Sequence, residues 1–475
     1  MKALNFSVLE ELTPVDNTRA DALIAEALSR FNKKIVVLDD DPTGVQTVHG
    51  VSVYTDWSAE TLCAGFLEDS PIFFVLTNSR GMTQSVTREA HTEIAKNLVA
   101  AANKTGKEFI VISRSDSTLR GHYPLETEVL RSEIEALCNT AFDGEIILPF
   151  FLEGGRFTIG NVHYVKEGDM LTPAGETEFA RDKTFGYSAS HLGEWCEEKS
   201  GRAYKTADMT YISIEELRCF DIEEIAKKLC AVTGFNKVIC NAASYADVKV
   251  FAAAYVRATA LGKNFMLRSA AAITKVLGGI PDRPLLTRDE LIEPQNRNGG
   301  LVIIGSHVNK TTQQLEALRN SGLQVEFIEF DQHRILEQNG LAQETLRVSE
   351  QAGQYITNGK TTVIFTRRDR FDLDTDDKNR QLEASVQISD AVTACVSELN
   401  ARPSFIIAKG GITSSDIGTK ALAVKKAIVM GQAAPGIPVW MTGSESRFAN
   451  MPYIIFPGNV GNEDTLLKIV ESLTK

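Results

Sequence analysis

The sequence has no long apolar stretch, no excess of basic residues and few cysteines for its length. None of its apolar runs approaches the ~20 residues of a membrane-spanning helix, so we expect no membrane partner. The formal net charge of −12 argues against a nucleic-acid partner, because a general nucleic-acid binder has a basic surface. Local sites can still be positive enough to bind an anionic ligand.

The 7 cysteines are scattered and no two have the CxxC spacing of a metal or redox site. Such a set is typical of reduced thiols, which favours a cytoplasmic protein. Several nucleotide and catalytic motifs are also missing: GxxxxGK[ST], GxGxxG, the HRD and DFG pair, HExxH and GxSxG. Their absence argues against a P-loop ATPase, a Rossmann dehydrogenase and a protein kinase.

Short apolar runs rich in Val, Ile and Phe recur along the 475 residues and end at polar residues or glycine. Because they lack strict alternation, they predict strands buried on both faces. The runs span residues 35–38, 72–76, 109–112, 146–148, 238–240, 301–304, 325–330, 363–365, 405–408, 437–441 and 453–456. Helical spacing lies between them, at 21–31, 87–103, 125–137, 310–318 and 416–427. Alternating strands and helices predict an α/β fold with mainly parallel sheets flanked by helices.

A polar stretch with three prolines, residues 279–300, predicts a linker between two domains. We therefore expect an N-terminal extension (1–33), a first domain (34–278) and a second domain (301–475), with the active site in the cleft between the domains. Residues 154–200 are rich in Gly and Thr and weakly periodic. They are either an excursion over the active site or a long surface loop.

Polar clusters follow three predicted strands of the first half, at residues 39–44, 77–81 and 113–121. In open α/β sheets, ligands bind beyond the carboxyl ends of the strands. Carboxylates bind hydroxyls or Mg²⁺, and arginines bind carboxylates or phosphates. Aspartates after a strand often only cap a helix or close a turn, but three clusters in succession favour a ligand site. They predict a site for a small hydroxylated acid.

Glycine-rich turns follow the strands of the second half, at residues 305–307, 409–414, 442–443 and 457–461. Glycine turns that lead into helices present backbone N–H groups to phosphates. Paired glycines alone also mark ordinary tight turns. Taken together with the first half, the pattern indicates a nucleotide-binding domain beside an acid-binding domain, as a kinase requires.

These motifs resemble those of the four-carbon acid sugar kinases. The segments that carry the resemblance are Asp40-Asp41-Pro42-Thr43-Gly44, Thr77 to Arg80, Asp116-Ser117-Thr118-Leu119-Arg120-Gly121, Phe179-Ala180-Arg181-Asp182, Gly305-Ser306, Gly410-Gly411-x-Thr413, Pro435-Gly436 and Pro457-Gly458-Asn459-Val460-Gly461. The resemblance covers nearly the whole chain from residue 35 onward. It implies a sugar-acid-binding domain followed by a nucleotide-binding domain.

The resemblance also implies an activity and a set of site residues. The activity is ATP-dependent phosphorylation of the terminal hydroxyl of threonate, erythronate or a keto-tetronate, with Mg²⁺ as cofactor. The substrate residues are Asp40, Asn78, Arg80, Ser117 and Arg120, with Asp116 or Asp41 as the catalytic base. We expect Arg80 and Arg120 to hold the substrate carboxylate. The nucleotide residues are Ser306, Gly410, Gly411, Thr413, Gly436, Gly458 and Gly461, and we expect Lys409 to add positive charge near the transferred phosphate. Metal ligands are not identified, and a homodimer is expected.

Two other functions stay open at this point. Ile412 stands where the family usually has an acidic residue, Lys409 where a Thr is common and His122 where Asn is frequent. Because of Ile412, a second possible function is that of a non-catalytic regulatory protein that binds a sugar acid on a kinase scaffold. A nucleotide-independent isomerase or aldolase of sugar acids would account for the first half, but not for the glycine turns of the second.

Overall fold

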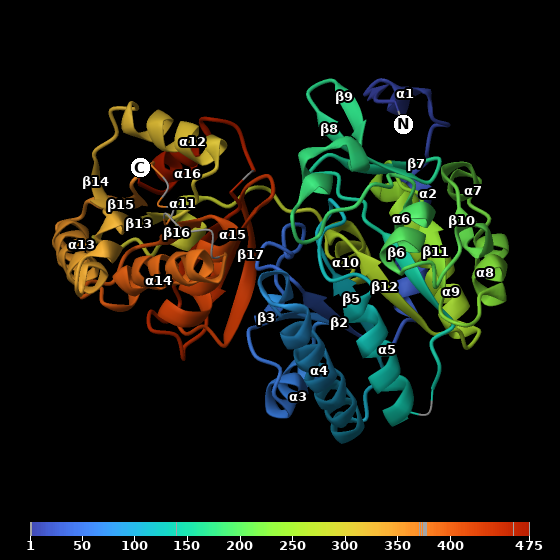
Figure 1. The fold of residues 1–475 in the computed structure, drawn as a ribbon. Coiled ribbons are helices and arrows are strands. Elements are labelled where there is room, and N and C mark those ends of the chain that lie inside the picture. The colour runs from blue at the N-terminus through green and yellow to red at the C-terminus, as the bar shows by residue number, and fades with distance from the viewer. Residues whose placement is uncertain are drawn as a thin grey trace. The chain divides into compact units, whose positions relative to one another are not determined.

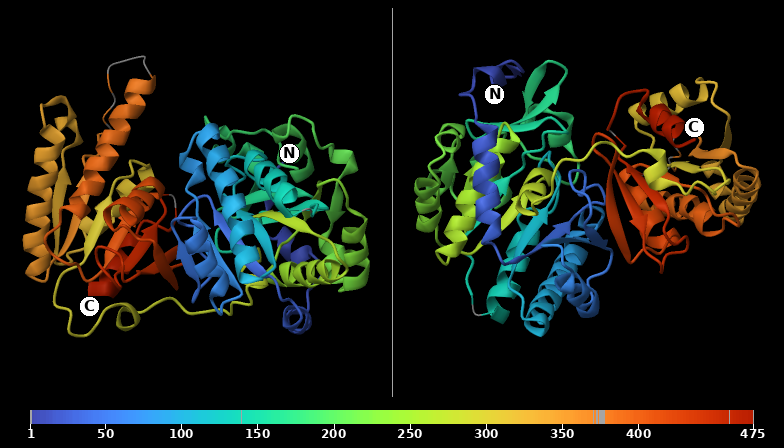
Figure 2. Two further views of the ribbon diagram at one scale, coloured as in Figure 1. Left: turned by 90° about the horizontal axis from the view of Figure 1, so that it is seen from below. Right: turned by 180° about the vertical axis from the view of Figure 1, so that it is seen from behind.

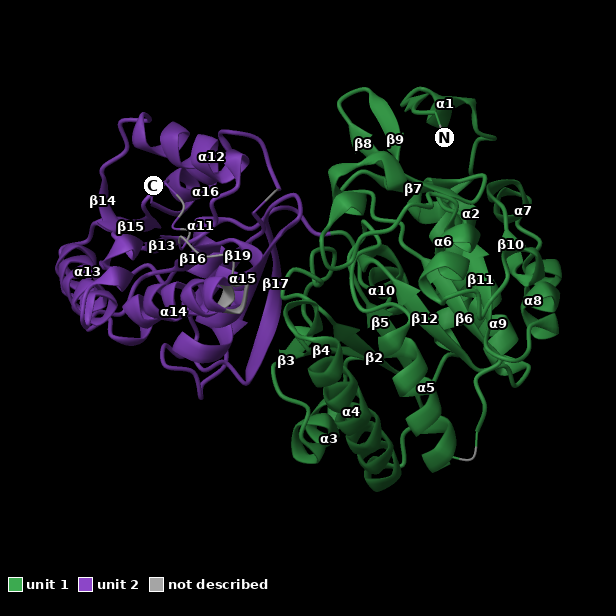
Figure 3. Ribbon diagram, viewed as in Figure 1, with its two compact units in different colours: residues 1–282 green, residues 283–475 purple. Residues whose placement is uncertain are grey.

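Two α/β units make up the chain, Met1–Asp282 and Arg283–Lys475 (Figure 3). The computed structural model describes residues 2–138, 140–369, 371, 373, 378–458 and 460–474. In each unit a mainly parallel sheet is flanked by helices, so the predicted α/β class with two domains is confirmed. No helix of the described residues is long and apolar enough to span a membrane.

Among the residues that the structure describes, the central sheet of the first unit contains eight strands, all parallel (Figure 1). Their order is β10 (Thr210–Ile212), β11 (Asn236–Cys240), β6 (Gly144–Leu148), β12 (Phe265–Ser269), β5 (Phe109–Arg114), β2 (Lys34–Asp39), β4 (Ile72–Leu76) and β3 (Ser52–Tyr54). Residues of β2 and β4 are buried throughout, as expected of strands covered on both faces. The four adjacent strands β12, β5, β2 and β4 are parallel, so their carboxyl ends lie side by side.

Helices cover both faces of this sheet (Figure 2). One face carries α3 (Ala59–Leu67), α4 (Gln84–Thr105) and α5 (Leu125–Cys138), and the other carries α2 (Asn17–Ser29) and α9 (Tyr245–Ala260). The remaining helices are α1 (Val8–Glu11), α6 (Leu192–Lys199), α7 (Ile214–Arg218), α8 (Ile222–Ala231) and α10 (Ala271–Leu277). Helix α4 begins at an N-cap, where the Thr83 side chain accepts from Val86 N–H, and ends at Gly106 with φ 64°. Local capping thus sets the ends of the longest helix in this unit.

Residues 154–200 fold onto an antiparallel sheet rather than forming an open loop. The sheet has the order β1 (Leu4–Asn5), β9 (Met170–Pro173), β8 (Val162–Glu167) and β7 (Arg156–Ile159). Its edge strand β1 comes from the expected N-terminal extension, and helix α2 of that extension packs on α9. The first 33 residues are therefore an integral part of this unit.

The second unit has a seven-stranded sheet in the described residues. Its order is β17 (Lys426–Ala434), β18 (Ile437–Thr442), β19 (Pro452–Phe456), β16 (Ile406–Lys409), β13 (Leu301–Ile304), β15 (Thr361–Thr366) and β14 (Val325–Phe330). Strands β19, β16, β13, β15 and β14 are parallel, and β17 and β18 form an antiparallel hairpin. The helices are α11 (Arg288–Leu291), α12 (Asn309–Arg319), α13 (Gly340–Thr357), α14 (Lys378–Ser397), α15 (Gly411–Asp416) and α16 (Thr465–Thr474).

The predicted apolar runs fall in strands, except that Phe405 of the run 405–408 lies just before β16, and one predicted helix is too long. Residues 416–427 were expected to be helical, but α15 ends at Asp416, a π-helix covers Ile417–Ala421, and β17 starts at Lys426. The reason is visible in β17, where Ala427 and Val429 are buried and Ile428 between them is exposed. This alternation has the period of a strand. Strand β12 was missed because its sequence, FMLRS, ends in two polar residues.

The turn after β2 depends on a glycine. A Cβ at Gly44 would lie 1.8 Å from Asp39 Oδ2, whereas a Cβ at Gly81 would meet nothing within 4 Å. We expect Gly44→Ala to destabilise the protein by about 1–3 kcal/mol, as overpacking of a buried site does. Gly81→Ala should stay within about 0.5 kcal/mol of the wild type. Urea unfolding of the three proteins checks this, and equal midpoints for the two variants would contradict it.

Candidate active site

Polar side chains that follow three neighbouring strands meet at the carboxyl edge of the first unit's sheet. Asp40 and Asp41 follow β2, Asn78 and Arg80 follow β4, and the 115–121 loop follows β5. Strands β5, β2 and β4 are adjacent in the sheet, which is why clusters about 35 to 40 residues apart in sequence come together. The sequence-predicted substrate residues of this unit thus lie at one edge.

Arg80 pairs with two aspartates. Its Nη2 donates to Asp40 Oδ1 at 2.5 Å, its Nε to Asp40 Oδ2 at 3.3 Å, and its Nη1 to Asp41 Oδ2 at 3.3 Å. Burial would raise the pKa of Asp41, but the charge of Arg80 and hydrogen bonds with Thr43 outweigh it and lower that pKa. Asp41 is therefore ionised at neutral pH, and the whole fork of Arg80 is engaged within the protein.

Asp116 is held by Arg120 in the loop after β5. Its Oδ2 accepts from Arg120 Nε at 2.6 Å and from Thr118 Oγ1. Burial opposes ionisation, but the charges of Arg120 and Arg80 hold the pKa of Asp116 far below its usual range. Its Oδ1 accepts no hydrogen bond in the described part of the chain, whereas each carboxylate oxygen of Asp40 and Asp41 accepts at least one. Asp116 thus offers an ionised oxygen to a ligand.

A buried hydrogen-bond network holds the Asp40 carboxylate in place. Ser115 Oγ donates to Asp40 Oδ2 at 2.6 Å, and Arg268 Nη2 donates to Ser115 Oγ at 2.7 Å. Arg268 also pairs with Glu126, which accepts from Ser79 Oγ at 2.5 Å. Sequence reasoning missed Arg268 because it missed β12, and the strand-end rule applied to that strand would have found it. The network fixes the aspartate that orients Arg80.

Asn78 and Ser117 contribute polar side chains that the protein leaves open. Neither side chain has a hydrogen-bond partner among the residues that the structure describes. Asn78 has φ 55°, a left-handed conformation that Asn tolerates better than most residues and that turns the chain sharply after β4. Both residues are thus available to hydrogen-bond the hydroxyls of a ligand.

Segment 154–200 lies against the 115–121 loop. His163 Nε2 donates to Ser117 O at 2.8 Å, and Tyr187 Oη donates to Thr118 O at 2.6 Å. Burial lowers the pKa of His163 to about 4, so its ring is neutral and acts as a fixed donor. Phe179, from the segment that matches the family motif, lies with its ring centroid 5.0 Å from Arg120 Cζ. The interpretation as an excursion over the site therefore fits the structure better than that of a surface loop.

In the second unit, loops after β13, β16 and β19 meet around Ser306 and Thr413. A Cβ at Gly305 would lie 2.5 Å from Thr413 Oγ1, and a Cβ at Gly458 would lie 3.3 Å from Ser306 Oγ. Gly410 has φ 123°, and a Cβ there would lie 3.2 Å from Ser306 Cβ. These close approaches of the glycine backbone to the side chains of Thr413 and Ser306 explain why the sequence has glycine at the three positions. Gly411 belongs to the same cluster, since α15 begins there.

Lys409 supports this cluster from inside. Its side chain is fully buried, and its Nζ donates to Pro457 O at 2.7 Å and to Gly458 O at 3.3 Å. Burial, with a smaller effect from the charge of Lys310, lowers the pKa of Lys409 to about 7. In this arrangement Lys409 holds the backbone after β19 in place.

Three other predicted nucleotide positions have different surroundings. Gly436 lies in the turn between β17 and β18, where its N–H donates to Gln432 Oε1 at 2.7 Å. Gly461 precedes α16, and a Cβ there would lie 2.7 Å from Thr465 Oγ1. Asn459 of the same motif lies outside the described residues.

Arg368 is a residue of this cluster that sequence reasoning missed. It follows β15, and its Nη2 donates to Ser306 O at 2.7 Å and to Thr312 Oγ1 at 2.9 Å. The strand at 363–365 was predicted, but the residues directly after it contain no glycine turn, which is the feature that marked the other candidate loops of the second half. The strand-end rule would have found Arg368 as well.

The comparisons with known proteins agree with this division. Residues 35–277 match the family model of a sugar-binding N-terminal domain, and residues 301–466 match that of a nucleotide-binding C-terminal domain. The chain belongs to the four-carbon acid sugar kinase family. The resemblance found in the sequence is thus confirmed, and the two units of this family member supply a sugar-binding and a nucleotide-binding domain. A search of curated protein sequences finds no match.

Two solved structures show the same fold. One is a Salmonella typhimurium LT2 protein provisionally named a tRNA synthase, at a TM-score of 0.63 and 14% identity, covering 92% of this chain and 98% of that one. The other is a Haemophilus influenzae protein of the DUF1537 family, at a TM-score of 0.59 and 17% identity, covering 92% and 100%. At these identities the likeness concerns the fold alone.

The buried Lys409 gives a prediction for pH. Its folded pKa of about 7 lies below the usual 10.5, so between these values the unfolded chain binds one more proton than the folded one. The free energy of unfolding of the wild type should then rise with pH relative to Lys409→Met, by about 1.4 kcal/mol per pH unit at most. Urea unfolding at several pH values between about 7 and 10 checks this. Lys425→Met, which removes an exposed lysine, should run parallel to the wild type, and a parallel Lys409→Met would contradict the prediction.

Proposed function

We propose that the protein is an ATP-dependent kinase that phosphorylates the terminal hydroxyl of a four-carbon acid sugar of the threonate, erythronate or keto-tetronate class. The observation that carries the proposal is the presence of a sugar-binding and a nucleotide-binding domain in one chain. A protein that binds an alcohol and a nucleotide together has what phosphoryl transfer requires, which is positioning and charge stabilisation.

On the acceptor side, Asp116 is our candidate for the residue that orients the attacking hydroxyl and accepts its proton. The sequence left Asp116 and Asp41 as alternatives. The free Oδ1 of Asp116 favours this residue, because both oxygens of Asp41 already accept hydrogen bonds. A carboxylate of low pKa is a weak base, so most of its effect would come from orientation, which suits the loose transition state of phosphoryl transfer.

The other acceptor residues would fix the sugar chain. The open side chains of Asn78 and Ser117 would hydrogen-bond its hydroxyl groups. Asp40, Asp41 and Arg80 would form the charged wall beside them, with Arg80 balancing the two carboxylates. A polyol held at several hydroxyls has its terminal oxygen fixed, and fixed geometry lowers the barrier of a two-substrate reaction by as much as about 7–11 kcal/mol.

On the nucleotide side, the glycine loops around Ser306 and Thr413 are the candidate phosphate site. Backbone N–H groups of Gly411 and Gly458 would contact the phosphates, and Gly410, whose N–H donates to Phe456 O at 2.9 Å, would leave room for a phosphate to approach closely. Arg368, which already holds Ser306 O, would add positive charge to this site. Gly436 and Gly461 stay predictions from the sequence.

The donor set of the protein suits Mg²⁺ only as a nucleotide complex. Among the described residues, no three His, Cys, Asp or Glu side chains converge where they could hold a metal ion. Mg²⁺ commonly keeps several waters and takes its remaining ligands from substrate phosphates and one or two carboxylates. We therefore expect Mg²⁺ to bind with ATP, where it would neutralise phosphate charge. The location of the site in a cleft between the domains and the homodimer stay predictions.

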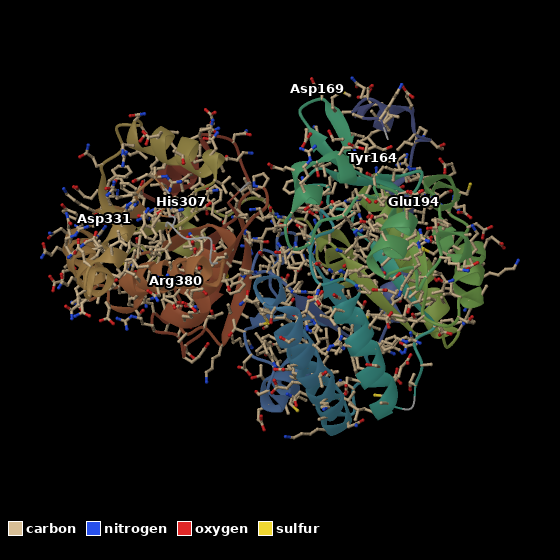
Figure 4. All side chains as sticks on the ribbon, viewed as in Figure 1. Tyr164, Asp169, Glu194, His307, Asp331 and Arg380 are labelled. Carbon is tan, nitrogen blue, oxygen red and sulfur yellow. The ribbon has the colours of Figure 1, made fainter. Side chains whose placement is uncertain are left out.

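The role of Asp116 is tested by Asp116→Asn. The substitution keeps the shape of the side chain but removes the charge, so kcat with Mg-ATP and the best four-carbon acid should fall by about 10²- to 10⁴-fold. Asp169→Asn is the matched control, because Asp169 lies exposed in the turn between β8 and β9 (Figure 4). ADP release measured against threonate, erythronate and their keto derivatives gives both rates. A near-normal kcat for Asp116→Asn would contradict the assignment, and wild type that releases no ADP with any of these acids would contradict the kinase proposal.

The glycine cluster is tested by Gly410→Ala. A methyl group at Gly410 would press on Ser306 Cβ at 3.2 Å, in the place where we expect phosphate. The wild type should gain about 2.7 kcal/mol of stability at Mg-ATP concentrations 100 times the dissociation constant, and the variant should gain far less. Gly322→Ala is the control, because Gly322 also has positive φ (74°) but no atom within 4 Å of its Cβ. Thermal unfolding with and without Mg-ATP decides, and an equal gain in both variants would exclude a phosphate site at Gly410.

A further inference from the structure

Among the arginines near Asp116, Arg156 has no carboxylate partner. Arg80 is divided between Asp40 and Asp41, and Arg120 pairs with Asp116. Arg156 has no carboxylate oxygen within 4.0 Å in the part of the chain that the structure describes. Arginines buried among aspartates normally pair with them, so an unpaired one beside the site calls for a negative partner from outside the protein.

The position of Arg156 is fixed by its backbone. It is the first residue of β7, its N–H donates to Phe151 O at 2.8 Å, and its carbonyl accepts from Phe151 N–H at 3.1 Å. Strand β7 continues into the antiparallel sheet through its pairing with β8. The base of the side chain therefore cannot drift, which is what a residue that selects a ligand requires.

The side chain leaves one edge of its guanidinium without an acceptor. Nη1 donates to Gly154 O, whereas Nε is buried without a partner and Nη2 has none among the described residues. Arg156 Cζ lies 5.7 Å from the centroid of the Phe179 ring, which Arg120 Cζ approaches at 5.0 Å. The guanidinium that holds Asp116 and the one that is open thus both lie within 6 Å of the same ring.

The charges around Arg156 point in the same direction. Burial lowers the pKa of Arg156, and the charge of Asp116 opposes this, so the two groups interact electrostatically without forming an ion pair. A partly desolvated guanidinium is stabilised by any anion that reaches it. The Nη2 group, unlike the buried Nε, is the part of the guanidinium that a ligand can reach, and it can donate a charge-assisted hydrogen bond to a carboxylate oxygen.

We propose that Arg156 binds the carboxylate of the substrate acid, and that Arg80 and Arg120 hold the aspartates of the site in place. The proposal rests on the kinase function proposed above and names the residue that distinguishes an acid from an uncharged polyol. It replaces the expectation from sequence that Arg80 and Arg120 hold the substrate carboxylate. A neutral ligand would leave the guanidinium edge unpaired, so the site should discriminate by charge.

The experiment measures binding without turnover. Calorimetry in the absence of nucleotide gives the dissociation constants of threonate or erythronate, whichever the wild type binds better, and of the corresponding uncharged carboxamide. The proteins are the wild type, Arg156→Gln, Arg156→Lys and the control Arg202→Gln, which changes an exposed arginine of the same unit. Arg156→Gln should bind the acid about 10- to 100-fold more weakly, the size expected for hydrogen bonds between charged groups, and the carboxamide nearly as the wild type does.

The outcomes separate this proposal from the kinase function. If the wild type binds and phosphorylates the acid but Arg156→Gln binds it equally well, or loses acid and carboxamide equally, the role of Arg156 is wrong and the function stands. If the wild type neither binds nor phosphorylates any four-carbon acid, both are wrong. Should circular dichroism show that Arg156→Gln is unfolded, Arg156→Lys decides. The lysine keeps the charge but not the fork, so an affinity equal to that of the wild type would overturn the proposal.

Discussion

The ion pairs between Arg80 and the two aspartates after β2 determine how the acceptor site is built. Carboxylates buried at the edge of a sheet are costly unless they are paired and hydrogen-bonded. Arg80 contributes three N–H groups to Asp40 and Asp41, and Ser115 donates the remaining bond to Asp40. Once these bonds are made, the strand ends of β2, β4 and β5 are fixed relative to one another. Asp116, which also interacts with Arg80, is thereby kept ionised.

This arrangement separates two uses of arginine in one site. Arg80, Arg120 and Arg268 are engaged with Asp and Glu side chains and act on the geometry of the protein. Arg156 lies on a different element, an antiparallel strand outside the central sheet, and is left open. A residue that must accept a ligand and release it cannot also be needed to neutralise a buried aspartate. Placing the two tasks on different sheets allows the ligand to bind without weakening the ion pairs of the core.

In the nucleotide-binding domain, the candidate site is held in place by close packing rather than by ion pairs. Where the acceptor site contains ion pairs, this candidate site contains close approaches of Gly305, Gly410 and Gly458 to the side chains of Ser306 and Thr413. The buried Lys409 donates to backbone oxygens of the loop after β19. It therefore holds that loop in place, whereas the arginines of the acceptor site hold carboxylates. Such a surface suits a phosphate, because backbone N–H groups are uncharged donors that need no counter-ion when the phosphate is absent.

The sequence predicted well those features that depend on residues close together along the chain. Apolar runs followed by Asp, Asn, Ser and Gly indicated both the strands and the residues that follow their carboxyl ends. Such a strand end can be recognised because the apolar run and the polar residues lie close together in the sequence. It could not show which arginine pairs with which aspartate, since Arg80 and Asp40 are 40 residues apart and their pairing depends on strand order. Arg156 was missed for the same reason. Its segment has weak periodicity, and only the three-dimensional structure shows that β7 returns to the loop after β5.

The same structure gives a role to the residues that precede the family match at residue 35. Strand β1 pairs with β9, and the Phe6 ring lies 5.9 Å from that of Phe157, the residue next to Arg156. Lys166 of β8, whose backbone N–H donates to Gly155 O, lies 3.8 Å above the Phe6 ring. A small antiparallel sheet with a free edge is only marginally stable, and these contacts add a strand and an aromatic pair to it. Because β7 of this sheet carries Arg156, a segment outside the family's shared core helps to fix the guanidinium that we propose reads the charge of the substrate.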